Sequence, residues 1–155
     1  LHSIPAFPDR LTFLFSFFII LANQNQIERG NPNVITNQRA HRLLGFFADP
    51  AAHSKSPFMY NTAFQKLGMD YVYLAFQIDQ TSLADAIRSM RTLQMRGANV
   101  SMPNKTAVNN TDDISTEARL CNAVNTIVNE NGRLIGYNTD GTGAMLALSH
   151  ARRSI

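Results

Sequence analysis

Residues 43–78 read LLGFFADPAAHSKSPFMYNTAFQKLGMDYVYLAFQI, and the order of segments within them decides the fold class. The apolar run at residues 43–48 is typical of a buried strand. Residues 71–78 are rich in β-branched and aromatic residues, which predicts a second strand. Between them, residues 56–67 predict a helix that ends at Gly68, because glycine readily adopts the left-handed conformation of a helix end.

The start and the buried side of this helix are also predicted. Ser56 is the expected N-cap, and Pro57 suits the first helical position, where its missing N–H costs no hydrogen bond. Phe58, Phe64 and Leu67 are expected to form the apolar side.

Beyond residue 78, the alternation of helices and strands continues. Helices are predicted at residues 81–96, 115–121 and 142–152, and strands at residues 98–101, 123–129 and 133–137. Gly97 is the expected end of the first of these helices. Asn131-Gly132 predicts a hairpin, because a type I′ turn needs positive φ at both central residues. The prediction is an α/β fold: a mostly parallel sheet flanked by helices, with one antiparallel hairpin.

Length, cysteine content and charge limit the function classes. The 155 residues suit one domain, and a single cysteine, Cys121, excludes an internal disulfide. The net charge of +3 divides into +2 for residues 1–42 and +1 for residues 43–155, where three Lys and seven Arg face nine Asp or Glu. Because the basic residues form no cluster, we expect no nucleic-acid partner.

Residues 1–42 differ in composition from the rest, and we expect them to lie outside the domain formed by residues 43–155. Their apolar stretch, residues 11–22, spans about 18 Å as a helix, well short of a hydrocarbon core of about 30 Å, so we expect no membrane span. The stretch has the length of a signal-peptide core, but Asp9 offsets Arg10 and no clear cleavage site follows. We favour a disordered or non-native extension.

Four polar clusters lie near predicted strand ends, where open α/β sheets bind ligands. They read HSKSP at residues 53–57, NVSMPNK at 99–105, AVNT at 123–126 and NTDG at 138–141. Each also has an ordinary structural explanation. Serine and aspartate cap helices, asparagine completes loops, and a lone lysine is usually a solvated surface charge.

In this order, the clusters resemble the shikimate dehydrogenase family over residues 43–151. The segments SMPNK at 101–105 and GYNTDGTG at 136–143 are most similar to its quinate/shikimate dehydrogenase branch. The resemblance implies the substrate-binding catalytic domain of a two-domain enzyme. Such an enzyme oxidises shikimate reversibly to 3-dehydroshikimate with NAD or NADP, and oxidation of quinate to 3-dehydroquinate is a further candidate reaction.

The resemblance also implies roles for individual residues. Lys105 and Asp140 would form the catalytic pair, since a lysine held near a carboxylate can move the proton of an alcohol. The residues that would bind substrate are Ser54, Ser56, Tyr73, Ser101, Asn125 and Thr139.

Neighbouring residues are given supporting roles. Met102 and Pro103 would surround the catalytic pair with a medium of low dielectric constant. His53 is expected to be a structural neighbour of the two serines, and Cys121 to pack within its helix. No spacing of His, Cys and carboxylates indicates a metal site.

No G-x-G-x-x-G segment follows a predicted strand, and Gly141-Thr142-Gly143 lacks the later glycine. The family resemblance implies a following Rossmann domain that binds NAD or NADP, so we expect the chain alone to lack turnover. Two other interpretations stay open: a stand-alone module that binds shikimate-like acids without redox turnover, and a different two-domain dehydrogenase. We expect a small-molecule partner, no nucleic-acid or membrane partner, and a cytoplasmic location. Cofactor choice, substrate preference and oligomeric state stay open.

Deleting residues 1–40 is expected to leave the melting temperature of the domain unchanged, because no packing partner for residues 11–22 is evident in the sequence. Thermal unfolding of the full and shortened chains, followed by circular dichroism, tests this. A marked fall in melting temperature on deletion would show that the segment belongs to the core.

Overall fold

The computed structural model describes residues 42–108 and 110–152, and the first 41 residues, with the apolar stretch predicted there, lie outside them. The described residues fall into two compact units, which are residues 42–138 and residues 139–152. No helix in these described ranges has the length and hydropathy of a membrane span.

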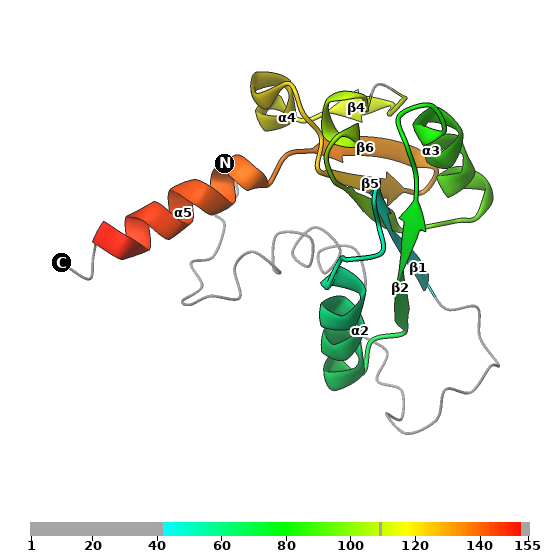
Figure 1. Ribbon diagram of the computed structural model, residues 1–155, viewed down its shortest axis with the longest axis horizontal. Helices are drawn as coiled ribbons and strands as arrows, with labels where there is room; N and C mark the ends of the chain where they lie inside the picture. The colour runs from blue at the N-terminus through cyan, green and yellow to red at the C-terminus, as the bar shows by residue number, and fades with distance from the viewer. Residues whose placement is uncertain (1–41, 109, 153–155) are drawn as a thin grey trace. The chain divides into compact units, whose positions relative to one another are not determined.

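The larger unit is built on one sheet of six strands in the order β2-β1-β3-β5-β6-β4 (Figure 1). The strands are β1 (Arg42–Ala48), β2 (Tyr71–Gln77), β3 (Gly97–Val100), β4 (Asp113–Ile114), β5 (Thr126–Glu130) and β6 (Arg133–Tyr137). Strand β1 lies parallel to both β2 and β3, and β4 lies parallel to β6. The predicted α/β class with a mostly parallel sheet is confirmed. The hairpin β5–β6 also joins β3 in antiparallel orientation, which was not predicted.

The helices are α2 (Ser56–Leu67), α3 (Leu83–Thr92), α4 (Thr116–Cys121), α5 (Asp140–Arg152) and the 3₁₀ turn η1 (Asn104–Thr106). Helix α5 forms the described part of the smaller unit and begins two residues before its predicted start. Helix α4 starts as predicted, with the Ser115 hydroxyl accepting a hydrogen bond from the Ala118 N–H at 3.2 Å.

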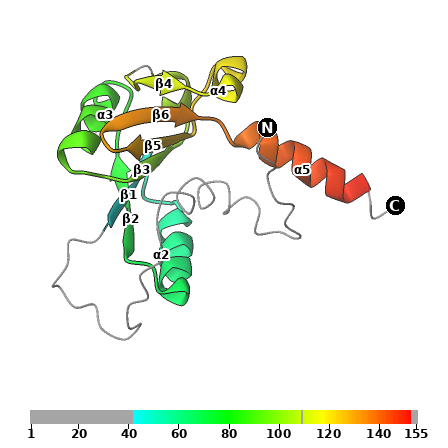
Figure 2. The ribbon, with the colours of Figure 1, turned by 180° about the vertical axis from the view of Figure 1, so that it is seen from behind.

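Helices α2 and α3 pack on different faces of the sheet. On one face, Phe47 and Ile127 belong to an apolar core with Ile87 and Met90 of α3. On the other face, α2 lies alongside β2 (Figures 1 and 2), and Tyr60 stacks on Tyr73 with ring centroids 4.5 Å apart. This separation follows from the alternation of side chains along each strand.

The buried side of α2 differs from the prediction. Phe58 is 80% exposed and Leu67 is 56% exposed, whereas Tyr60 and Phe64 are buried. Only one stripe at i, i+4 spacing faces β2, so other apolar residues of the helix stay at the surface. The predicted end at Gly68 is confirmed, with φ of 63°.

The cap of α2 also differs. Lys55, not Ser56, is the N-cap residue, and it makes no side-chain capping bond. Instead the Ser54 hydroxyl accepts a hydrogen bond from the Ser56 N–H at 3.2 Å. Serine therefore does supply the oxygen at this helix start, but from one residue earlier than a standard N-cap.

Helix α3 is shorter than predicted at its N-terminal end, where Asp79 organises residues before it. The Asp79 carboxylate accepts hydrogen bonds from the Ser82 hydroxyl, the Ser82 N–H and the Thr81 hydroxyl. These bonds lower the pKa of Asp79 to about 2, and the bond from the Ser82 hydroxyl contributes most. Residues 81 and 82 thus form a turn around the carboxylate, and the helix begins at Leu83.

The C-terminal end of α3 was also predicted too late. The helix ends at Thr92, because Gln94 adopts a left-handed conformation with φ of 52°. The Met95 N–H then bonds to the Met90 carbonyl at 2.9 Å, which buries Met95 against the core. Gly97, the predicted stop, is instead the first residue of β3.

The predicted hairpin turn is confirmed, since Asn131 and Gly132 have φ of 55° and 97°. Beside it, Asp112 accepts hydrogen bonds from the Leu134 N–H and from Arg91 of α3, each at 2.6 Å. These bonds lower the pKa of the Asp112 carboxyl, the one from the Leu134 N–H most strongly. Strand β4, two residues long, follows Asp112 and had no signal in the sequence.

Gly136→Ala is expected to reduce the free energy of unfolding by about 1–3 kcal/mol, because a Cβ there would lie 2.9 Å from a methyl of the stiff, buried Val124. Gly45→Ala is the matched control. Its Cβ would lie 2.8 Å from the flexible terminal methyl of Met95 and 3.1 Å from the Phe47 ring, so its cost should be smaller than that of Gly136→Ala. Urea unfolding of both variants compares them, and equal losses would contradict this account.

Candidate functional site

The segment that carries Lys105 is attached at the end of β3. The Val100 N–H bonds to the Asn125 carbonyl at 2.8 Å, and the Ser101 N–H bonds to the Phe47 carbonyl at 3.0 Å. The chain then enters η1, where the Val124 N–H bonds to the Lys105 carbonyl at 2.8 Å. These main-chain bonds fix the position of the Lys105 backbone relative to β1 and β5.

Asn104 is a further anchor of this segment, which the sequence analysis missed. Its side chain is fully buried, and its Nδ2 donates to the Ile78 carbonyl at 2.7 Å. At the surface, Gln80 Nε2 donates to the Pro103 carbonyl at 3.0 Å. The loop after β2 therefore holds the turn on which Lys105 sits.

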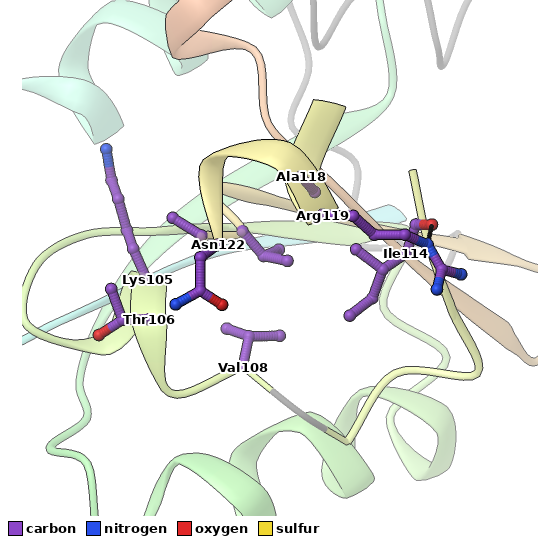
Figure 3. Close-up of a pocket in the computed structure, with 9 residues that line it drawn as sticks. Lys105, Thr106, Val108, Ile114, Ala118, Arg119 and Asn122 are labelled. Atoms are coloured by element: carbon purple, nitrogen blue, oxygen red, sulfur yellow. Dashed lines mark hydrogen bonds between the residues drawn. The ribbon is translucent and has the colours of Figure 1, made fainter. Parts of the chain in front are cut away.

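A cavity of about 240 Å³ lies between η1 and α4 (Figure 3). Its walls include Val108, Ile114 and Ala118, with Asn122 at its polar part. Figure 3 shows the Lys105 side chain extending away from Val108 and Ile114, so Lys105 borders the cavity with its stem only. Lys105 is the one predicted site residue that lines this cavity. The cavity therefore does not match the predicted substrate site.

Ser54 lies on the loop that follows β1, here called the serine loop, and Ser56, the first residue of α2, lies at its end. Gln77, at the end of β2, holds this loop by bonding to Asp49 and by accepting from the Ala51 N–H at 2.9 Å. Ser54 and Ser56 are partly exposed. Because β1 and β3 are parallel neighbours, the serine loop and the Lys105 segment leave the sheet at the same edge.

Asn125 reaches the same edge from the opposite direction. It directly precedes β5, which is antiparallel to β3, so the start of β5 lies beside the end of β3. Its N–H bonds to the Tyr137 carbonyl at 3.0 Å, and its side-chain Oδ1 accepts from the Thr126 hydroxyl at 3.0 Å. The structure thus brings Ser54, Ser56, Ser101, Lys105 and Asn125 to one edge of the sheet.

Tyr73 differs from its predicted role as a substrate contact. It has no exposed surface, because it lies in the middle of β2 under α2. Its hydroxyl donates to Asn99 Oδ1 at 2.8 Å. Burial, with a smaller contribution from Tyr60, raises the pKa of Tyr73 far above its usual value. The hydroxyl stays protonated, and in this structure it has no surface with which to touch a ligand.

Thr139 and Asp140 belong to the smaller unit. Asp140 is the first residue of α5, and the Thr139 carbonyl accepts a hydrogen bond from the Gly143 N–H at 3.0 Å. Both residues are partly exposed. The pairing of Lys105 with Asp140 joins residues of different units and stays a prediction.

Two supporting expectations are corrected. Met102 is 59% exposed and Pro103 is also exposed, because the turn they form projects from the end of β3, so they do not wall Lys105 off from water. Cys121 is exposed instead of packed, since it lies in the last turn of the short helix α4, away from the core residue Ala118. Over residues 42–108 and 110–152, no three His, Cys, Asp or Glu side chains cluster as metal ligands would.

The described residues do not fit a dinucleotide. A dinucleotide-binding turn places glycines in a loop between strand and helix, where the backbone approaches the pyrophosphate. Here Gly141 and Gly143 lie inside the first turn of α5, which already begins at Asp140. The third glycine position is Leu146.

Comparison with known proteins agrees with the fold and with the prediction of a substrate-binding domain. The family described as the shikimate dehydrogenase substrate binding domain matches residues 46–127, which is more than half of the chain. The chain belongs to this family. The substrate-binding domain is 51% identical over 109 residues to shikimate dehydrogenase (NADP(+)) of Alkaliphilus metalliredigens, and 53% identical over 110 residues to that of Streptococcus uberis. These matches cover 70% and 69% of this chain but 38% and 37% of those proteins.

Solved structures agree. A crystal structure of shikimate 5-dehydrogenase from Listeria monocytogenes, in complex with shikimate and NAD, has a TM-score of 0.70 and 49% identity. The match covers 76% of this chain and 42% of that one. A 5-ketofructose reductase of Gluconobacter has a TM-score of 0.68 and 35% identity, over 72% of this chain and 40% of its own. The chain spans about two fifths of the length of its curated relatives.

Asn104→Ala is expected to lower the free energy of unfolding by about 1–3 kcal/mol, because the fully buried Asn104 side chain no longer bonds to the partly buried Ile78 carbonyl. Gln80→Ala removes a hydrogen bond to the same loop at an exposed position, so its cost should be about 0.5 kcal/mol or less. Urea unfolding measures both. Similar losses for the two variants would show that the buried amide is not the anchor.

Proposed function

We propose that this domain supplies the substrate side of a shikimate dehydrogenase that uses NADP, with shikimate as substrate. The observation that carries the proposal is identity above 50% to proteins named shikimate dehydrogenase (NADP(+)). The family match over residues 46–127 contains the serine loop, Lys105 and Asn125. The Listeria enzyme, a solved relative, was crystallised in complex with shikimate and NAD.

The edge of the sheet suits a polyhydroxylated acid. Ser54, Ser56 and Ser101 offer hydroxyls, and Asn125 offers an amide, so the site can donate to and accept from ring hydroxyls. Ser54 and Ser56 also lie at the N-terminus of α2, whose first turn has no acidic residue. The dipole of this 12-residue helix favours a carboxylate there.

Oxidation of a secondary alcohol to a ketone releases the hydroxyl proton. We assign Lys105 as the group that accepts this proton and returns it in the reverse direction. Asp140 would orient the ammonium and stabilise its charge. NADP would accept the hydride, and because the described residues form no dinucleotide loop, we assign this chain the substrate and proton-transfer side only.

Quinate is a second candidate substrate, supported by the sequence SMPNK at residues 101–105, which resembles the quinate/shikimate branch. We place the enzyme in the cytoplasm, where the exposed thiol of Cys121 would stay reduced. A binding module without turnover is the alternative that the kinetics below would reveal.

Lys105→Ala is expected to lower kcat for shikimate oxidation by about 10²–10⁴-fold with a small effect on KM, because general acid–base catalysis acts in the transition state. Asp140→Asn should behave similarly, whereas Ser56→Ala should mainly raise KM. Steady-state kinetics of the natural enzyme that contains this chain, with NADP and with NAD, measures the constants. Lys66→Ala, in the last turn of α2, is the control and should match the wild type. A near-normal kcat for Lys105→Ala would refute the assigned role.

A further inference from the structure

Four polar side chains form a continuous row of hydrogen bonds beneath the candidate site. The Tyr73 hydroxyl donates to Asn99 Oδ1 at 2.8 Å, and Asn99 Nδ2 donates to Thr126 Oγ1 at 3.2 Å. Thr126 Oγ1 in turn donates to Asn125 Oδ1 at 3.0 Å. The row runs from β2 through β3 to β5 and ends at Asn125, which is predicted to bind the substrate.

The direction of donation along this row is set at Tyr73. Among the described residues, Asn99 Oδ1 is the single partner of the Tyr73 hydroxyl, and Tyr73 has no exposed surface. If both amides were reversed, the buried Tyr73 proton would have no acceptor, which is costly. Asn99 must therefore present its oxygen to Tyr73 and its nitrogen to Thr126. Thr126 is 1% exposed, and among the described residues Asn125 Oδ1 is the one acceptor for its hydroxyl proton, so this proton is directed to Asn125.

The origin of the row is held rigidly. Asn61 of α2 bonds to the backbone of Tyr73 on both sides, with its Oδ1 accepting from the Tyr73 N–H at 2.8 Å and its Nδ2 donating to the Tyr73 carbonyl at 2.9 Å. Tyr60 stacks on the Tyr73 ring with an interplanar angle of 21°. These contacts fix both the backbone and the ring that places the hydroxyl.

We propose that this row of hydrogen bonds sets the orientation of the Asn125 amide, so that Nδ2 is the group presented to an acceptor oxygen of the substrate. Tyr73, Asn99 and Thr126 are then positioning residues, which act on the ligand through Asn125 without touching it. The proposal rests on the proposed function, in which Asn125 contacts shikimate. The proposal gives the fully buried Tyr73, which the family resemblance implied as a substrate-binding residue, an indirect role in substrate binding.

Affinity for shikimate tests the coupling. Tyr73→Phe and Thr126→Val in the full chain should each weaken binding about 3- to 10-fold, the worth of one well-oriented hydrogen bond. The double variant should be no weaker than either single one, because each change breaks the same row. Thr126→Ser keeps the hydroxyl and should restore affinity. Tyr71→Phe, on the same strand, deletes a hydroxyl that bonds to exposed Arg42 and should bind as wild type.

Isothermal titration calorimetry measures these affinities, and NMR of the Asn125 side-chain amide in the ligand-free chain gives an independent readout. The resonances of the two Nδ2 protons should shift in Tyr73→Phe, although strands β1 and β3 lie between that residue and β5, and should not shift in Tyr71→Phe. Unchanged Asn125 signals, or losses of affinity that multiply in the double variant, would overturn the proposal. A wild-type chain that binds no shikimate would count against the proposed function, while the ligand-free NMR comparison would still decide whether the row orients Asn125.

Discussion

Two main-chain hydrogen bonds at the end of β1 govern the geometry of the candidate site. The Ile78 N–H bonds to the Ala48 carbonyl, and the Ser101 N–H bonds to the Phe47 carbonyl, each at 3.0 Å. Both donors lie one residue beyond their strands, so the pairing continues past β2 and β3. Because β1 is the middle of these three parallel strands, three loops emerge together from one edge. The serine loop, the loop after β2 and the Lys105 segment are therefore positioned by the sheet itself.

The two faces of the sheet serve different purposes. The face under α3 is an apolar core in which Ile87, Met90 and Ile127 are fully buried. The face under α2 is apolar at β2, where rings stack, and becomes polar at Asn99 and Thr126. A buried polar group is tolerated only when it is hydrogen-bonded, and the row from Tyr73 to Asn125 meets this requirement on the face that leads to the site.

Local sequence patterns predicted most elements of the fold because each depends on few neighbours. The strand at Arg133–Tyr137 and the turn at Asn131-Gly132 were both predicted from adjacent residues. The end of α3 was not, because Gln94 takes a left-handed conformation that usually signals glycine. The exposure of Phe58 was missed for a different reason, since which stripe of a helix is buried depends on the strand it meets.

For the site, motifs predicted which residues bind substrate, whereas only the structure shows how these residues are connected. Ser54, Lys105 and Asn125 come from three separate segments, and their shared edge depends on strand pairings far apart in the sequence. Tyr73 was assigned by resemblance as a ligand contact, but its position under α2 leaves it no exposed surface. A motif cannot distinguish a residue that touches the ligand from one that acts on it through a neighbouring side chain, because both roles can require the same residue type.

Asparagine side chains illustrate how the structure separates these roles. Asn61, Asn104, Asn129 and Asn138 each donate to a main-chain carbonyl, on β2 or in a loop. An amide used in this way replaces a missing backbone partner and stabilises the fold. Asn99 instead bonds through its side chain to two other side chains, a hydroxyl donor and a hydroxyl acceptor. The backbone of β3 is already paired on both sides, so this amide is not needed to complete the sheet. Its remaining consequence is the orientation of Thr126, and through it Asn125, which links the buried face of the sheet to the edge where a substrate would bind.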